Sequence, residues 1–248
     1  VTALHLAISS GCLAIVQMLL SRGASIEALD GLGRPVLHHI AWGRDEDKTA
    51  MARLLLDGGA NPDAADRTAP ETSQATAAQR DTKKLMQLYL DRGVDVNAVD
   101  GDGLTALHYA VLYSGDAGGV EFLLENGAEV EAQDKKGRTS LHMAVNQRSL
   151  SSDQVFRDII SIWIGRGGNI DLPDNNGQTP LHWAARRDLP RAIFDLIRKG
   201  ANIEATDEIG RTPLHAACEQ GPWTDSIQVL VGSGANIEAC DISGLTPL

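Results

Sequence analysis

Apolar residues recur along the chain in pairs of short helical patterns. In the stretch 174–206, Leu181, Ala184 and Ala185 stand three and four positions apart, the spacing of one face of a helix. A second group with the same spacing lies at 193–197. Each group spans only two or three helical turns, so the pattern predicts a helix, a short turn and a second helix.

Turn and capping residues fix the ends of these two helices. Asp174 to Gly177 is typical of a turn, because Asp can accept a hydrogen bond from the backbone two residues on and Gly tolerates positive φ. Thr179 is placed to cap the first helix, with Pro180 at its first position. Gly200 is placed to end the second helix in a left-handed conformation. The order is therefore β-turn, helix, turn, helix.

The same pattern returns along the whole chain. The Thr-Pro-Leu-His motif at Thr179 to His182 recurs, complete or with one change, at Thr2 to His5, Thr105 to His108, Thr139 to His142 and Thr212 to His215. Leu37-His38 keeps its second half, and Thr246-Pro247-Leu248 its first. A glycine recurs every 33 to 40 residues, at Gly23, Gly59, Gly93, Gly127, Gly167, Gly200 and Gly234.

A period near 33 with this motif resembles the ankyrin repeat family over essentially the whole chain. The resemblance implies an all-α repeat solenoid of helix-turn-helix units joined by β-turn or hairpin loops. The first helices carry small residues where the second helices carry pairs such as Leu123-Leu124. We therefore expect a curved stack with the first helices on the concave side.

The pattern divides the chain into seven repeats and a fragment, which we expect to form a single array. They are 1–29, 30–65, 66–99, 100–133, 134–173, 174–206, 207–240 and the partial 241–248. Repeat three is degenerate, because its first helix at 72–79 has neither the Leu nor the His. It folds as a degenerate repeat or is locally disordered, and we expect the former. Both chain ends cut a repeat, which predicts a segment of a longer protein.

Charge and cysteine content exclude several classes of function. A net charge of −11 and a pI near 5.0 argue against a general binder of nucleic acid or of anionic membranes, which needs a basic surface. No apolar run approaches the length of a membrane span. Three cysteines without paired spacing indicate a reducing compartment, so we expect a cytoplasmic protein, with the nucleus as the alternative.

The seven histidines do not predict a metal site or a catalytic site. Six occupy one repeat position, so neighbours lie about one helix spacing apart, about 8–10 Å, too far for two ligands of one zinc ion. We expect each ring to be hydrogen-bonded near a helix start and to tie one repeat to the next. Glu27, Glu131, Glu204 and Glu238 also recur at one position, which favours a scaffold role or a solvated edge. We expect no enzymatic activity and no cofactor.

The variable positions of the turns and first helices are where ankyrin proteins usually bind partners. The matching residues are Leu32, Arg34, Trp42, Leu104, Leu112, Tyr113, Lys135, Lys136, Arg138, Asn146, Gln147, Asn175, Asn176, Gln178, Arg186, Arg187, Ile209 and Arg211. Six of these, in repeats five to seven, are basic, although the protein is acidic. Aromatic and arginine side chains are common interface anchors.

These features favour a non-catalytic scaffold that binds another protein along the concave face, across repeats four to seven. An acidic or extended partner segment fits the basic positions. The isolated segment is expected to be monomeric. The alternative is a regulatory or sensing arm attached to an enzymatic or nucleotide-binding domain outside this segment. The choice stays open, since a repeat fold does not fix a function.

Overall fold

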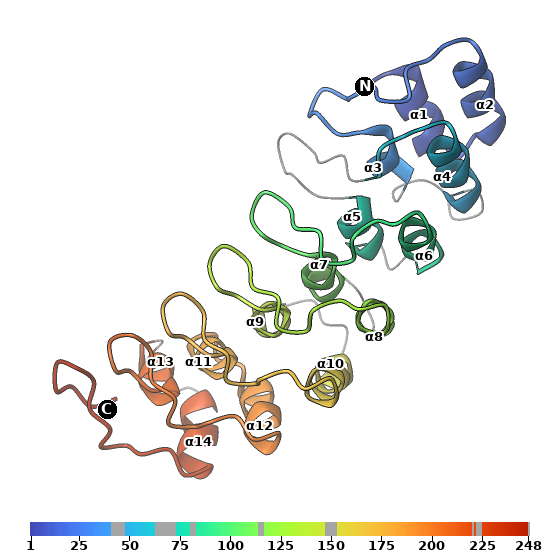
Figure 1. The fold of residues 1–248 in the computed structure, drawn as a ribbon. Coiled ribbons are helices and arrows are strands. Elements are labelled where there is room, and N and C mark those ends of the chain that lie inside the picture. The colour runs from blue at the N-terminus through green and yellow to red at the C-terminus, as the bar shows by residue number, and fades with distance from the viewer. Residues whose placement is uncertain are drawn as a thin grey trace. The chain divides into compact units, whose positions relative to one another are not determined.

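The computed structural model describes residues 1–40, 48–62, 73–79, 83–113, 117–146, 153–219, 221 and 225–247. The chain divides into two compact units, here unit 1 and unit 2, which meet in sequence at Glu129 and Val130. Each unit is built from consecutive helix pairs joined by turns (Figure 1). Trp42 and Gln147 lie outside the described residues.

Unit 1 contains four helix pairs. Their helices are α1 (Ala3–Ser9), α2 (Leu13–Ser21), α3 (Val36–Ile40), α4 (Lys48–Asp57), α5 (Ser73–Gln79), α6 (Lys83–Asp91), α7 (Ala106–Tyr113) and α8 (Gly118–Glu125). Each first helix packs against its own second helix, and α1, α3 and α5 also pack against the first helix of the next pair. This nearest-neighbour packing is the defining property of a repeat stack.

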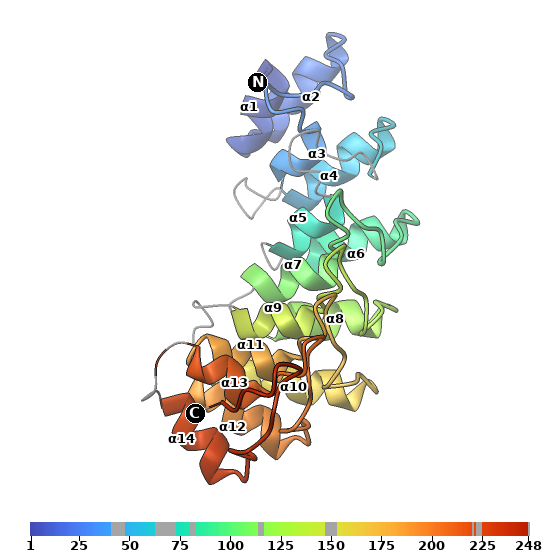
Figure 2. The same cartoon turned by 90° about the vertical axis from the view of Figure 1, so that its left-hand side faces the viewer.

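Unit 2 contains three helix pairs packed in the same way. They are α9 (Ser140–Asn146), α10 (Asp153–Gly165), α11 (Pro180–Arg186), α12 (Pro190–Arg198), α13 (Pro213–Cys218) and α14 (Asp225–Gly232). Helices α10, α12 and α14 lie on the side away from the turns in Figure 1. In Figure 2 the turns of unit 2 run alongside one another.

The helices are too short to be stable alone. The described helices range from 5 residues in α3 to 13 residues in α10. Isolated helices shorter than about 12–15 residues are marginal in water, so stability must come from packing. Ala144, Ala184 and Ala217 of the first helices are fully buried, and so are Leu196 and Leu230 of the second helices. Each such buried leucine contributes about 1.5–3 kcal/mol relative to an exposed one.

Repeat three forms its helix pair despite the missing motif. Helix α5 covers most of the stretch in which the sequence lacks the Leu and His, and α6 follows it. Ala75, Ala77 and Ala78 are fully buried, and α5 packs against α7. Small side chains therefore fill the first-helix position without the usual Leu-His pair. The described residues of this repeat therefore form a helix pair, and the division of the chain into repeats stays a prediction.

The described residues contain helices and turns, with only two isolated β-bridges, Leu29 to Pro35 and Gln133 to Thr139. Both bridges close a turn in hairpin fashion, as the sequence predicts. The fold is therefore an all-α repeat solenoid. None of the described helices is both long and apolar enough to cross a membrane.

Candidate functional site

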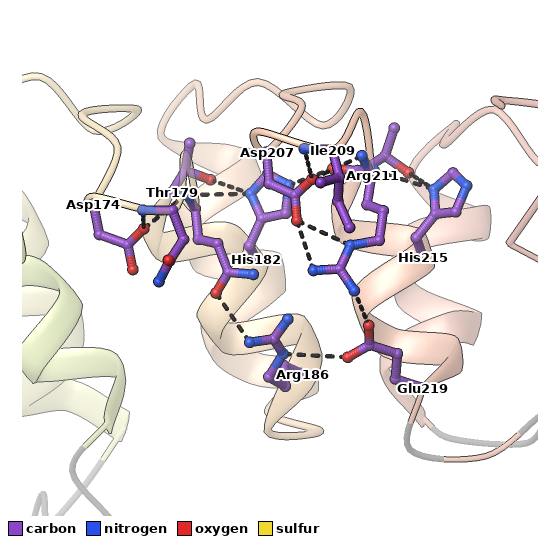
Figure 3. A network of polar contacts seen from close by, with 12 residues as sticks. Asp174, Thr179, His182, Arg186, Asp207, Ile209, Arg211, His215 and Glu219 are labelled. Atoms are coloured by element: carbon purple, nitrogen blue, oxygen red, sulfur yellow. Dashed lines mark hydrogen bonds and ion pairs between the residues drawn. The ribbon is translucent and has the colours of Figure 1, made fainter. Parts of the chain in front are cut away.

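A threonine and a histidine are hydrogen-bonded to each other at the start of the first helices that carry the full Thr-x-Leu-His motif. We call this pair the clamp. In α11 the backbone amide of Thr179 donates to Nδ1 of His182 at 3.2 Å, and the Thr179 hydroxyl lies 2.9 Å from the same nitrogen (Figure 3). Because Nδ1 accepts, the ring proton sits on Nε2, which donates to the carbonyl oxygen of Arg211 at 2.9 Å. The clamp thus joins one repeat to the next.

The same clamp recurs in both units. Nε2 of the ring reaches a carbonyl oxygen in the following repeat at His5 to Arg34, His142 to Gln178, His182 to Arg211 and His215 to Leu245. The distances range from 2.9 to 3.2 Å. The predicted role of the repeated histidine, a hydrogen-bonded tie between repeats, is confirmed at these four positions.

Burial favours the neutral form of two of these rings, His142 and His182. Desolvation lowers the pKa of His182 and of His142, and the carbonyl that each ring contacts opposes the shift only in part. A neutral ring is what the clamp requires, because a protonated Nδ1 could not accept the threonine amide. The rings are therefore structural groups rather than proton-transfer groups.

Each turn is closed by its first residue, an aspartate. Asp207 Oδ1 accepts the backbone amides of Ile209 and Arg211 at 3.1 and 2.9 Å. Its Oδ2 accepts Nε and Nη2 of Arg211 at 3.0 and 2.9 Å (Figure 3). Burial opposes ionisation of Asp207, but these hydrogen bonds outweigh it and lower the pKa of the carboxyl. Arg34 with Asp30 and Arg138 with Asp134 repeat the arrangement.

The residue after the clamp histidine also binds the turn aspartate in repeats two, four and six, and the turns of repeats four and six have no arginine. The indole Nε1 of Trp183 donates to Asp174 Oδ2 at 3.0 Å. The hydroxyl of Tyr109 donates to Asp100 Oδ2 at 2.7 Å. In repeat two, His39 Nε2 lies 3.0 Å from Asp30 Oδ2, beside Arg34. Sequence reasoning missed this role, although a donor nine residues after the turn aspartate could have signalled it.

The turns of unit 2 are joined to one another through their backbones. The amide of Asn175 donates to the carbonyl of Lys136 at 2.9 Å. In the same way, Glu208 donates to Asn176 at 3.1 Å and Ile242 to Ile209 at 3.0 Å. We call these three contacts the turn ladder. It fixes the spacing of the turn tips before any partner binds.

The turns pack so closely that a side chain would not fit between them. Gly177 has φ +75°, and a Cβ placed there would lie 2.6 Å from the amide nitrogen of Glu208. Gly137 is crowded in the same way by the backbone nitrogen of Asn175, also at 2.6 Å. Both glycines are therefore needed for the close approach as well as for the turn.

A shallow depression lies between the turns of repeats six and seven. It has a volume of about 230 Å³ and is lined by Asn176, Gln178, Arg186, Asp207, Glu208, Ile209 and Arg211. Arg186 is held by two partners: its Nη1 donates to Gln178 Oε1 at 3.0 Å, and its Nε lies 3.4 Å from Glu219 Oε2 (Figure 3). Arg211 also forms an ion pair with Glu219.

Comparison with known protein families identifies the architecture. A family model of ankyrin repeats in three copies matches residues 37–134, 74–152, 128–207 and 151–241, and a model of the single ankyrin repeat matches residues 1–31. The chain belongs to the ankyrin repeat family. Ankyrin repeats are generally protein–protein interaction modules. A search of curated proteins found no match to this ankyrin chain.

Three of the six basic residues predicted to cluster in repeats five to seven are bound to acidic or amide side chains in the ankyrin fold. Arg138 and Arg211 bind the aspartates of their own turns, and Arg186 lies between Gln178 and Glu219. The sequence showed the basic residues but not their acidic neighbours in space. Lys135, Lys136 and Arg187 are exposed, so the positive charge offered to a partner is concentrated on these three side chains.

The other predicted contact residues differ in exposure. In unit 2, Asn175, Asn176 and Ile209 are exposed, whereas Gln178 is only 5% exposed. Gln178 therefore positions Arg186, and its contact with a partner stays a prediction. Asn146 ends α9, and its side chain lies outside the description.

Unit 1 carries its own predicted contact residues. Leu32 and Tyr113 are exposed, and Leu104, Leu112 and Arg34 are half-buried. The ring of Tyr113 stacks on that of Tyr109, with centroids 6.1 Å apart. These positions remain predictions as binding residues.

The recurring glutamates, which stand four residues after the helix-ending glycines, have a structural role. Oε1 of Glu27, Glu131 and Glu204 accepts a backbone amide of the next repeat, from Asn61, Asn169 and Asn236 respectively. The expected scaffold role is thus confirmed for these three glutamates. In the described part of the chain, no group of three or more His, Cys, Asp or Glu side chains could hold a metal ion.

Proposed function

We propose that this ankyrin array is a non-catalytic scaffold that binds an extended segment of a partner protein. The proposed surface consists of the turn tips and first helices of unit 2. The turn ladder is the observation that carries the proposal, because it holds successive tips at fixed spacing. A preorganised surface loses less conformational entropy when a partner binds.

The exposed side chains indicate the chemistry of that segment. Lys135 and Lys136 form a positive end at the turn of repeat five. Ile209, 42% exposed, is an apolar contact beside the depression at the turn of repeat seven. A partly acidic segment with an apolar side chain farther along would match both ends.

Charge reversal at the exposed lysines, combined with a polar substitution at Ile209, tests the proposal. The triple variant Lys135→Glu, Lys136→Glu, Ile209→Asp changes exposed side chains only. Arg186 is left unchanged, since its reversal would place a carboxylate beside Glu219 and disturb the fold. A matched control is Lys83→Glu with Lys84→Glu, two exposed adjacent lysines on α6 of unit 1.

Quantitative affinity capture from cell extract, analysed by mass spectrometry, compares the three proteins. We expect a set of proteins to be retained by the wild type and by the control and lost from the triple variant. Circular dichroism should show equal helix content for all three. Equal capture by wild type and triple variant would reject this surface.

A further inference from the structure

A groove crosses the second helices of unit 2. These helices lie on the side away from the turns (Figure 1). The groove has a volume of about 580 Å³, and its lining includes Arg157 of α10, Arg191, Phe194, Asp195 and Arg198 of α12, and Val229 of α14. This groove shares no lining residue with the depression between the turns.

The repeats show that Phe194 is unusual at its position. Phe194 stands six residues before the helix-ending Gly200. The residues at that position in the other six repeats are polar and exposed: Gln17, Arg53, Gln87, Glu121, Ser161 and Gln228. Phe194 is also exposed, at 54%, so the aromatic ring is not there to fill the core. An exposed aromatic with no packing role is a common sign of an interaction site.

The next position, residue 195, differs from the other repeats in the opposite sense. Asp195 is 7% exposed, whereas the other repeats carry apolar residues there: Met18, Leu54, Leu88, Phe122, Ile162 and Val229. Repeat six thus places an apolar ring outside and a carboxylate inside. Burying a carboxylate costs folding free energy, so packing alone does not explain why repeat six has Asp195 at this position.

The buried carboxylate holds an arginine at the groove. Nη1 of Arg157 lies 3.7 Å from Asp195 Oδ2, and its Nη2 donates to Gln154 Oε1 at 3.1 Å. Arg157 is thereby fixed across from α12. With Arg191 and Arg198, which are exposed, it gives three guanidinium groups against one carboxylate. The groove is positive although the chain carries a net charge of −11.

We propose that this groove is a second docking site, which binds an acidic protein segment carrying one apolar side chain. The apolar side chain packs on Phe194 and Val229, and a flanking carboxylate pairs with Arg198, in the positive surroundings of Arg157 and Arg191. Charge complementarity selects the acidic flanks, and the exposed ring selects a protein segment over a purely polyanionic ligand. The array would then hold two partners, one at its turns and one at its second helices.

Selection from a phage-displayed library of random 12-residue peptides tests the docking site on the 248-residue chain. We expect wild type to enrich peptides with an apolar residue between Asp or Glu residues. The best enriched peptide, labelled with fluorescein, then measures affinity by anisotropy. Phe194→Ser installs the residue that repeat five has at this position, so the helix should tolerate it. We expect it to weaken binding about tenfold or more.

Two further variants separate the contributions. Arg198→Gln should weaken binding several-fold and reduce its salt dependence. Gln17→Ser makes the matched substitution on α2 of unit 1 and should leave the affinity unchanged. The triple variant at Lys135, Lys136 and Ile209 should also bind normally, which distinguishes this site from the proposed turn surface.

Three outcomes would overturn the proposal. One is no enrichment of acidic peptides. A second is equal affinity for wild type and Phe194→Ser at equal helix content. The third is tighter binding to single-stranded oligonucleotides or to vesicles with anionic lipid, lost in Arg198→Gln and unaffected in Phe194→Ser, which would assign the groove to a polyanion.

Discussion

The Nε2 atom of His182 lies 2.9 Å from the carbonyl oxygen of Arg211, 29 residues farther along the chain. Through this contact the start of one first helix holds the end of the following turn (Figure 3). The turn ladder adds backbone contacts between the same two turns. Each repeat is therefore held chiefly by its neighbours, and a defect at one joint should weaken the stack locally.

Replacing His182 with alanine should destabilise unit 2 strongly. The change leaves the buried amide of Thr179 without its acceptor and removes one of the two hydrogen bonds that the carbonyl of Arg211 accepts. We expect a loss of about 2–4 kcal/mol in the free energy of unfolding, measured by urea denaturation. The exposed neighbour Arg187, changed to alanine, should cost about 0.5 kcal/mol or less. Equal losses for both variants would contradict the role of the clamp.

Stability should fall as the solution becomes acidic. The folded pKa values of His5, His142 and His182 lie below the ordinary 6.5, so the unfolded chain takes up protons first. Their contribution is complete above about pH 6.5 and is lost as the pH falls toward the folded values.

The turn aspartates extend the same trend to lower pH. Asp134 and Asp207 have folded pKa values below 3.8, so they stabilise the fold above that pH and lose this effect below it. Thermal melts from about pH 7.5 down to about pH 3 should show a steady decrease in Tm, first from the histidines and then from the aspartates. A Tm that rises over this range would show that the rings are not held neutral.

Two buried tyrosines of unit 1 offer a matched comparison. The Tyr109 hydroxyl donates to Asp100 at 2.7 Å, whereas the Tyr89 hydroxyl is buried without a hydrogen-bond partner among the described residues. Tyr109→Phe should cost about 1.5–3 kcal/mol, because it removes a hydrogen bond to a charged group. Tyr89→Phe should be neutral or stabilising. Urea unfolding of both variants checks the difference, and the reverse order would be inconsistent with the structure.

Close packing of the turns can be separated from backbone strain with two glycines. Gly177 and Gly200 both have positive φ, at +75° and +98°. A Cβ at Gly200 would meet nothing within 4 Å, whereas one at Gly177 would meet the backbone of the next turn. Gly200→Ala should cost about 1 kcal/mol from strain alone, and Gly177→Ala clearly more. Equal costs in urea denaturation would argue against close-packed turns.

The sequence predicts most of the fold because each repeat contains its own turn, capping and helix-forming residues. The clamp histidine recurs beside a threonine, so its position at a helix start and its tie to the next repeat follow from spacing. The small residues of α5 keep the helical period even without the motif, and the helix forms. Family resemblance and local chemistry agree at nearly every element.

The candidate surface is less predictable, since it depends on neighbours in space. Arg138 and Arg211 look like free basic groups in sequence, but each folds back on its own turn aspartate. Arg186 meets Glu219 only because α11 and α13 pack together. The exposed Phe194 is also not singled out by apolar periodicity alone. Its difference from the polar residues at the same position becomes visible only when the repeats are aligned.

Amide hydrogen exchange of Glu208, followed by NMR, tests most directly whether the turns of unit 2 form one preorganised surface. Its amide donates to Asn176 across the turn ladder. We expect exchange about 100-fold or more slower than in an unstructured peptide, with protection lost in Gly177→Ala. Exchange of the wild-type amide at the unstructured rate would show that the turn tips move independently and that no fixed surface awaits a partner.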